Sequence, residues 1–184
     1  MNAGIGVPGY AGYAPGTPLP SLRDILDGTP PAASPPMRVQ AVPGTAWAYS
    51  GGSYEIVQAL MEDVTGKPFA ELMQDLVLAP LGMTNTQFGQ PLPARLAGAA
   101  VTGHDATGAE LPGGWRIIPE LAAGGAWSTP RDLAILLADL GAAWRGQEGR
   151  LLYPETAREM FRRQPPGLYG LGVGVAGDGA GLFG

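Results

Sequence analysis

The sequence contains no cysteine, and it has a single histidine among its 184 residues. Without cysteine the chain forms no disulfide and offers no thiolate to a metal ion. One histidine, His104, leaves too few ligands for a zinc site, so we expect neither a metal nor a cofactor. Lysine and arginine together number only 11, against 16 acidic residues, for a formal net charge of −5. Because nucleic-acid binding depends on cationic side chains, this balance argues against a nucleic-acid partner.

Long apolar runs are also missing. No segment approaches the roughly 20 residues that span a bilayer, and the first residues lack the basic and apolar regions of a signal peptide. The sequence as written therefore predicts a cytoplasmic protein without a membrane partner. Glycine (30) and proline (19) are abundant, while 45% of the residues are hydrophobic. This combination indicates compact helices joined by long irregular segments.

We expect one domain over residues 1–184, mainly α-helical with one or two strands. Residues 1–42 form a Pro/Gly-rich loop region with one short helix, which Ser21 caps and Gly28 ends. Residues 43–88 hold a Tyr-Ser-Gly motif and two helices, and residues 127–184 hold helices and a C-terminal strand. Between these stretches the chain is predicted to be mostly loop, with short strands at AAVTG and WRII.

The predicted helices rest on apolar residues that recur at helical spacing. The first apolar face comprises Ile56, Val57, Leu60, Met61 and Val64, before a stop at Gly66. The second comprises Phe69, Leu72, Met73, Leu76 and Val77, and ends before Pro80. A third helix, capped by Thr129, is expected to bury Leu133, Leu136, Leu137 and Leu140. A last helix is predicted from Pro154 to about Arg163, and Tyr169 to Val175 alternate like a strand.

The sequence offers weak signals for two other kinds of site, a dinucleotide-binding loop and a Ser-His-Asp triad. Gly172, Gly174 and Gly177 match G-x-G-x-x-G, but a dinucleotide site also needs a following helix and an acidic residue about 20 positions on. We interpret this match as chance in a glycine-rich tail. A Ser-His-Asp triad has only His104 to draw on and lacks a G-x-S-x-G elbow, so it remains an alternative that depends on spatial geometry alone.

Three stretches resemble motifs of one hydrolase family, the serine β-lactamases, D-Ala-D-Ala carboxypeptidases and esterases of the class C type. PGTAWAYSGGSY with TGKPF and PLGMTNT resembles the family's tyrosine motif and the helices after it. LAAGGAWSTPRDLA resembles its A-G-G-L-x-S-T-x-x-D-L-A motif, and LYGLGVGV resembles its Y-G-L-G-W strand. In the first stretch the matching residues are Pro43, Gly44, Trp47, Tyr49, Ser50, Tyr54, Thr65, Gly66, Pro68, Phe69, Pro80, Leu81, Gly82, Met83 and Thr86.

The resemblance implies a site in which a tyrosine helps to move a proton beside a nucleophilic serine and its lysine. Tyr49 matches that tyrosine and is the candidate base. Ser50, Gly51, Gly124 and Gly125 are the candidate substrate-binding residues, and Gly51 stands where asparagine is common. The family's S-x-x-K does not occur, and neither K-T-G nor H-x-G follows the last strand. The resemblance thus implies the helical subdomain of the β-lactamase-like α/β fold, truncated at both ends.

Two functional hypotheses follow. In the first, the chain is a hydrolase that acts on a small activated ester or amide through a residual or rewired site, with Tyr49 as base and His104 as the alternative. A tyrosine hydroxyl stays protonated near neutral pH unless its neighbours favour the ionised form. In the second, the chain is a non-catalytic fragment. It assembles into a homo-oligomer, with a dimer favoured, through helix faces that a sheet would otherwise cover.

Overall fold

Helices and loops make up nearly all of the structure. The computed structural model describes residues 5–176 and 181–183. The elements in chain order are α1 Leu22–Asp27, α2 Gly52–Thr65, α3 Phe69–Met73, the π-helical turn η1 Gln74–Leu78, α4 Ala79–Leu81, the 3-10 helix η2 Ala94–Ala99, α5 Leu121–Gly124, α6 Pro130–Trp144, α7 Pro154–Phe161, β1 Gly174–Ala176 and β2 Gly181–Phe183. The two strands pair antiparallel. The expectation of a mainly helical fold with little sheet is confirmed.

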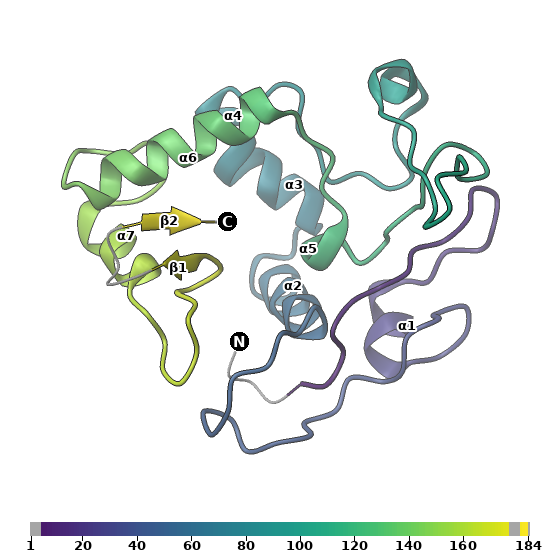
Figure 1. Cartoon of the computed structure of the whole chain (residues 1–184), viewed down its shortest axis with the longest axis horizontal. Coiled ribbons are helices and arrows are strands. Elements are labelled where there is room, and N and C mark those ends of the chain that lie inside the picture. Colours follow the sequence, from purple (N-terminus) through teal and green to yellow (C-terminus); the bar gives the residue numbers. More distant parts are fainter. Residues whose placement is uncertain (1–4, 177–180, 184) are drawn as a thin grey trace.

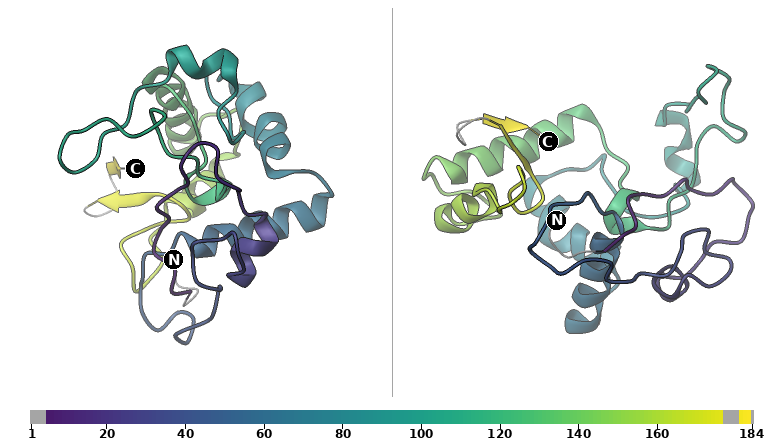
Figure 2. Two further views of the ribbon diagram at one scale, coloured as in Figure 1. Left: turned by 90° about the vertical axis from the view of Figure 1, so that its right-hand side faces the viewer. Right: turned by 60° about the horizontal axis from the view of Figure 1, so that its bottom comes forward.

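The helix α2 lies in the middle of the molecule (Figure 1). It contacts α1, α3 and α5. Helices α6 and α7 pack on each other, and with the β1–β2 hairpin they lie on one side of α2. The helix α1 and the loops of the N-terminal region lie on the other side of α2, which the right-hand view of Figure 2 also shows. This arrangement places the start of α2 between the N-terminal loops and the segment that leads into β1.

The helix ends lie where local chemistry places them. Ser21 and Asp24 form a reciprocal capping box at the start of α1, and Gly28 ends that helix at φ 65°. Gly66 ends α2 at φ 68°. A left-handed backbone is accessible to glycine without the penalty that a Cβ imposes, so these two stops are local properties of the sequence. Thr129 likewise caps α6 by accepting the backbone N–H of Asp132.

The helical stretch after Pro68 runs further than expected. The prediction that it ends before Pro80 is wrong, because α3 continues through the π-helical turn into α4 and stops at Gly82. Pro80 occupies one of the first two positions of α4. Pro80 follows directly on the π-helical turn, and because proline has no backbone N–H, one carbonyl of that turn receives no hydrogen bond from it.

Two small hydrophobic clusters form the core. One unites the N-terminal segment with α1 through Ile5, Val7, Ile25 and Met37. The other unites α4 with α6 through Leu78, Leu81, Met83 and the partly buried Ile135 and Leu136. A buried carboxylate joins the same two parts: Asp132 Oδ2 accepts the Asn85 N–H at 2.9 Å and the Thr86 hydroxyl at 2.8 Å.

The polar and apolar faces of α2 lie opposite to the usual arrangement. Its buried residues are Gly52, Ser53, Glu55 and Gln58. Its apolar face is exposed: Leu60 keeps 61% and Val64 77% of its surface open to solvent. On α6 the expected buried stripe is only partly correct, because Leu140 is buried while Leu133 and Leu137 are exposed. The helix turns Ile135 and Leu136 toward the cluster around Leu78, which leaves Leu133 and Leu137 outside.

The expected short strands at AAVTG and WRII are wrong. Among the described residues, AAVTG holds no strand or bridge, and WRII holds only the isolated bridge of Ile117 with Tyr13. The expected strand from Tyr169 to Val175 begins only at Gly174, because the chain turns at Gly172, where φ is 85°. Gly177, the last glycine of the G-x-G-x-x-G match, lies outside the described residues. In the described part of the chain, no helix has the length and apolarity to cross a membrane.

The molecule exposes more surface than its size predicts. Its accessible area is 10733 Å² for a mass of 18.9 kDa. A folded monomer of that mass exposes about 8,300 Å² by the usual scaling of area with mass. The excess follows from the long loops and from the exposed apolar faces of α2 and α6.

Candidate functional site

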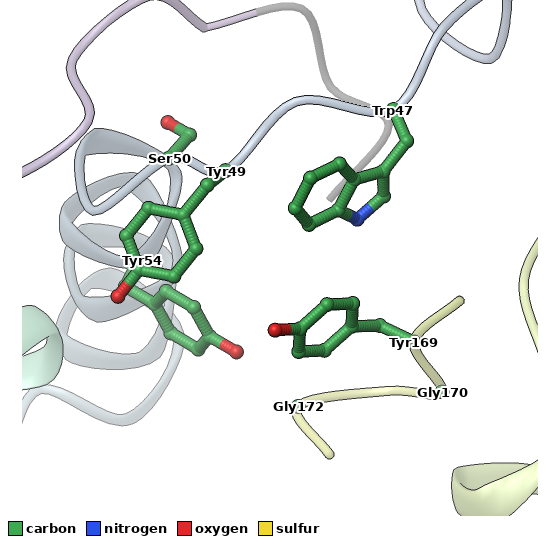
Figure 3. Close-up of a pocket in the computed structure, with 7 residues that line it drawn as sticks. All are labelled: Trp47, Tyr49, Ser50, Tyr54, Tyr169, Gly170 and Gly172. Atoms are coloured by element: carbon green, nitrogen blue, oxygen red, sulfur yellow. The ribbon is translucent and has the colours of Figure 1, made fainter. Parts of the chain in front are cut away.

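A pocket of about 170 Å³ opens where the start of α2 faces the segment that leads into β1 (Figure 3). Four aromatic side chains line it. They come from two regions far apart in the sequence. The lining residues are Trp47, Tyr49, Ser50, Tyr54, Tyr169, Gly170 and Gly172. We call this site the aromatic pocket.

The two sides of the aromatic pocket are joined by ring stacking. The Trp47 and Tyr169 rings are nearly parallel, with an interplanar angle of 8° and centroids 5.2 Å apart. A Cβ at Gly167 would overlap the Trp47 indole, so a glycine is required for this close approach. Gly172 faces the other wall, where an added Cβ would lie 3.5 Å from the Tyr54 hydroxyl.

Tyr49 and Tyr54 form the wall opposite Tyr169 (Figure 3). Tyr49 precedes α2 and keeps 65% of its surface exposed. Tyr54 lies in the first turn of α2 and is half-buried. Burial raises the pKa of the Tyr54 hydroxyl, and the neighbouring Tyr49 raises it further. Tyr54 therefore holds its proton firmly and serves as a hydrogen-bond donor, whereas Tyr49 is the hydroxyl most open to a ligand.

Ser50 lines the pocket but is engaged in holding the start of α2. It is 5% exposed, and its hydroxyl donates to the Val7 carbonyl at 3.3 Å. The same oxygen accepts the Ser53 N–H at 3.1 Å. This is the work of a helix-capping side chain. The single lysine, Lys67, follows the opposite end of the 14-residue helix α2, where it pairs with Asp75 at 2.8 Å.

Gly51 does not line the pocket, and its surroundings leave little room for a side chain. A Cβ there would lie 3.3 Å from both the Pro8 carbonyl oxygen and Cε2 of Tyr10. The backbone of Gly51 is ordinary, at φ −62° and ψ −37°, so space and not conformation favours glycine. The Tyr10 ring thus fills the place into which a larger residue at position 51 would project.

Gly124 and Gly125 also lie outside the pocket lining. They belong to the end of α5, which the polar face of α2 holds in place. Glu55 Oε1 accepts the Ala123 N–H at 3.1 Å, and Gln58 Oε1 accepts the Ala122 N–H at 3.1 Å. Because Glu55 and Gln58 are one turn apart, two adjacent N–H groups of α5 are bound from a single helix face.

Burial governs the charge state of the carboxyl groups behind this contact. Glu55 is fully buried and Glu120 is 1% exposed. Burial raises the pKa of Glu55 to about 7, with a smaller contribution from Glu120, and burial also raises the pKa of Glu120. Burial likewise raises the pKa of the Tyr10 hydroxyl beside them. Sequence motifs did not single out Glu55 and Glu120, since a buried acid is not visible in composition or spacing.

His104 lies in an exposed loop, in an isolated bridge with Glu110, and is not among the residues that line the aromatic pocket. Of the expected site residues, the structure brings only Tyr49 and Ser50 together in the pocket lining. The others lie outside it: Gly51, Gly124, Gly125 and His104. Among the described residues there is no cluster of three or more His, Cys, Asp or Glu that could hold a metal ion. Tyr169 was missed as a site residue, because nothing local ties it to the start of α2.

The fold places a tyrosine, Tyr49, directly before the central helix α2 and at the edge of the aromatic pocket. A family model described as Beta-lactamase matches residues 1–184. The chain belongs to the β-lactamase family.

Two relatives of known name align with part of the chain. The D-alanyl-D-alanine-carboxypeptidase/endopeptidase AmpH of Escherichia coli (strain K12) is 26% identical over 96 residues, which are 52% of this chain and 23% of that protein. A D-aminopeptidase of Gluconobacter oxydans (strain 621H) is 33% identical over 83 residues, 45% of this chain and 13% of that protein. The stretches that match thus cover less than a quarter of the length of these relatives.

The fold is also similar to solved structures. The D-amino acid amidase from Ochrobactrum anthropi SV3, complexed with L-phenylalanine, superposes with a TM-score of 0.71 at 22% identity. The superposition covers 98% of this chain and 52% of the amidase. At this identity the likeness establishes the fold alone.

Proposed function

We propose that the chain is a hydrolase that cleaves a small activated ester or amide at the aromatic pocket, with Tyr49 as the base. The observation that carries the proposal is the exposure of Tyr49 at the mouth of a cavity lined by Trp47 and Tyr54. Pockets of this kind, mostly apolar with a few hydroxyl groups, are typical substrate sites. The relatives support the reaction class, since they are named as a carboxypeptidase, an aminopeptidase and an amidase.

The proposal includes a rewired mechanism. Ser50 is buried and hydrogen-bonded, and among the described residues no lysine lies beside it, so the usual serine–lysine pair is not formed here. Tyr49 in its ionised form then takes a proton from a water molecule that attacks the carbonyl carbon, and this proton passes to the leaving alcohol or amine as its bond to that carbon breaks. We also propose that the chain corresponds to the helical part of the β-lactamase-like fold, which is consistent with its alignment to about half of the amidase, 52%.

The test is hydrolysis of p-nitrophenyl acetate and of D-phenylalanine p-nitroanilide by the purified protein and two variants. Tyr49→Phe removes the hydroxyl and keeps the ring, so we expect kcat/KM to fall by about 10² or more if Tyr49 is the general base. Tyr153→Phe is the matched control, because Tyr153 is 75% exposed and is not among the residues lining the pocket. Full activity in Tyr49→Phe would refute the role of Tyr49, and His104→Ala would then be examined.

A second candidate function is assembly without catalysis. It is favoured by the excess exposed area, about 2,400 Å² by the scaling of area with mass. A standard interface buries about 800 Å² per partner, and part of the excess lies on exposed apolar helix faces that such a contact would cover. The exposed apolar face of α2, made of Ile56, Val57, Leu60 and Val64, provides such a surface. A symmetric dimer of two copies is the assembly we propose, because two-fold closure buries the same face on both.

A further inference from the structure

The walls of the aromatic pocket consist of ring faces and hydroxyl groups. Trp47, Tyr49, Tyr54 and Tyr169 surround the cavity, with Ser50 and the glycines completing it. Among the described residues that line it, none carries a positive or negative charge. A charged ligand in this pocket therefore has no residue of opposite charge to pair with and no residue of like charge to repel it.

Aromatic faces carry partial negative charge. An ammonium group placed over such a face is attracted by the ring quadrupole, most strongly by tryptophan and then by tyrosine. The same walls offer a carboxylate hydroxyl donors but no cation, and the ring faces repel a negative charge. The pocket therefore discriminates by the sign of the ligand charge although it is itself uncharged.

The rings are held ready for a ligand. Trp47 stacks on Tyr169 at 5.2 Å, and the glycine at 167 lets the Trp47 ring approach the backbone closely. The stacking covers one face of each ring, but Trp47 is 37% and Tyr169 41% exposed, so part of each side chain is open to solvent. Preformed and open aromatic faces bind without a rearrangement that would offset the gain.

We propose that the aromatic pocket binds ligands through an ammonium group, primary or quaternary, and prefers them over neutral and anionic isosteres. The inference deepens the proposed function, since it names the substrate feature that the same site would recognise. A cavity of about 170 Å³ suits a small head group such as trimethylammonium or a free amino terminus. The net charge of −5 favours the approach of cations at low salt.

A matched ligand series tests the inference on the unmodified protein. Choline, 3,3-dimethylbutan-1-ol and 3,3-dimethylbutanoate have nearly the same shape and differ in charge. Binding is measured at about 0.15 M salt, where long-range attraction is screened, by titrating the ligand methyl signals in proton NMR spectra. We expect choline to bind roughly 2- to 30-fold more tightly than the neutral alcohol, the range that one cation–π contact supplies. Equal affinity for choline and the alcohol would overturn the inference.

Variants locate the binding. Tyr169→Leu removes one ring but keeps apolar bulk, and we expect it to lose most of the preference for choline. Tyr153→Leu changes an exposed tyrosine elsewhere and should keep it. Trp47→Leu serves as the second pocket variant if Tyr169→Leu does not fold. If Tyr153→Leu loses the preference to the same extent, the binding is not at the pocket and the inference fails.

The binding test is independent of turnover. A protein that prefers choline but hydrolyses neither p-nitrophenyl acetate nor D-phenylalanine p-nitroanilide retains the binding site and refutes the proposed reaction. A protein that hydrolyses the substrates but binds the three isosteres equally refutes the ammonium preference alone.

Discussion

The ring of Tyr10 lies against Gly51, with its Cε2 atom 3.3 Å from the position that a Cβ at residue 51 would take. The two residues belong to segments that are also joined by a backbone hydrogen bond, from the Gly51 N–H to the Pro8 carbonyl. The glycine in place of the family's common asparagine is therefore matched by an aromatic ring from the N-terminal loop.

This packing predicts that a larger residue at position 51 displaces the Tyr10 ring and the Pro8 backbone and lowers stability. Gly51→Ala should lower the free energy of unfolding by about 1–3 kcal/mol, because a side chain inserted into filled space forces its neighbours apart. Gly51→Asn should lower it further. Urea denaturation measures both, with Gly98→Ala as control, since nothing lies within 4 Å of a Cβ at Gly98. Equal stability of all three variants would show that Tyr10 yields the space freely.

The buried Glu55 predicts a loss of stability with rising pH. Burial raises the pKa of Glu55 from its ordinary 4.5 to about 7. Between these values the folded chain holds a proton that the unfolded chain has released. The free energy of unfolding therefore falls as pH rises from about 4.5 to 7.

The variant Glu55→Gln tests this linkage. Glutamine keeps an oxygen for the Ala123 N–H and cannot ionise, so the decline between about pH 4.5 and 7 should become shallower. It should not vanish, because burial also raises the pKa of Glu120. Urea denaturation at several pH values measures the slope, and Asp63→Asn, an exposed change on the same helix, should leave it unaltered. If the free energy of unfolding fell equally with pH in Glu55→Gln and in the unmodified protein, the raised pKa of Glu55 would be contradicted.

We further predict that the chain forms no acyl-serine adduct with a penicillin or a fluorophosphonate. The sequence has no S-x-x-K, Ser50 is capping α2, and Lys67 is paired with Asp75. A serine without an activating base is a weak nucleophile. Intact-protein mass spectrometry, with a serine β-lactamase treated in parallel, should show the unmodified mass. A stoichiometric adduct would restore the usual mechanism.

The proposed dimer makes a separate prediction. The double change Leu60→Glu and Val64→Lys places opposite charges one turn apart on the exposed face of α2 and should yield a monomer with undiminished helix content. Light scattering after size exclusion and circular dichroism measure the two properties. Val101→Glu, at an 85% exposed loop position, is the control and should remain dimeric. A monomeric unmodified protein at tens of micromolar would contradict assembly through this face.

Local features were predictable from the sequence, and long-range ones were not. The start and end of α1 depend on Ser21 and Gly28, and the end of α2 depends on Gly66, and each effect acts within one turn. The spacing of Leu133 and Leu137 identified an apolar face of α6, but periodicity does not say what will cover it. At the pocket, the tyrosine motif pointed to Tyr49, while its facing wall, Tyr169, follows from how the chain returns to the start of α2.

The orientation of α2 also bears on the heat capacity of the chain. Unfolding raises the heat capacity mainly by hydrating apolar surface that the fold had hidden. In a single copy of this protein the apolar side of α2 is already hydrated, and its inward side is held by the hydrogen bonds of Glu55 and Gln58. The increment on unfolding a monomer should therefore lie below the common value of about 12–15 cal/mol/K per residue. The free energy of unfolding would then change little over a wide range of temperature and pass through a shallow maximum. Hydrogen bonds would contribute an unusually large share of that free energy.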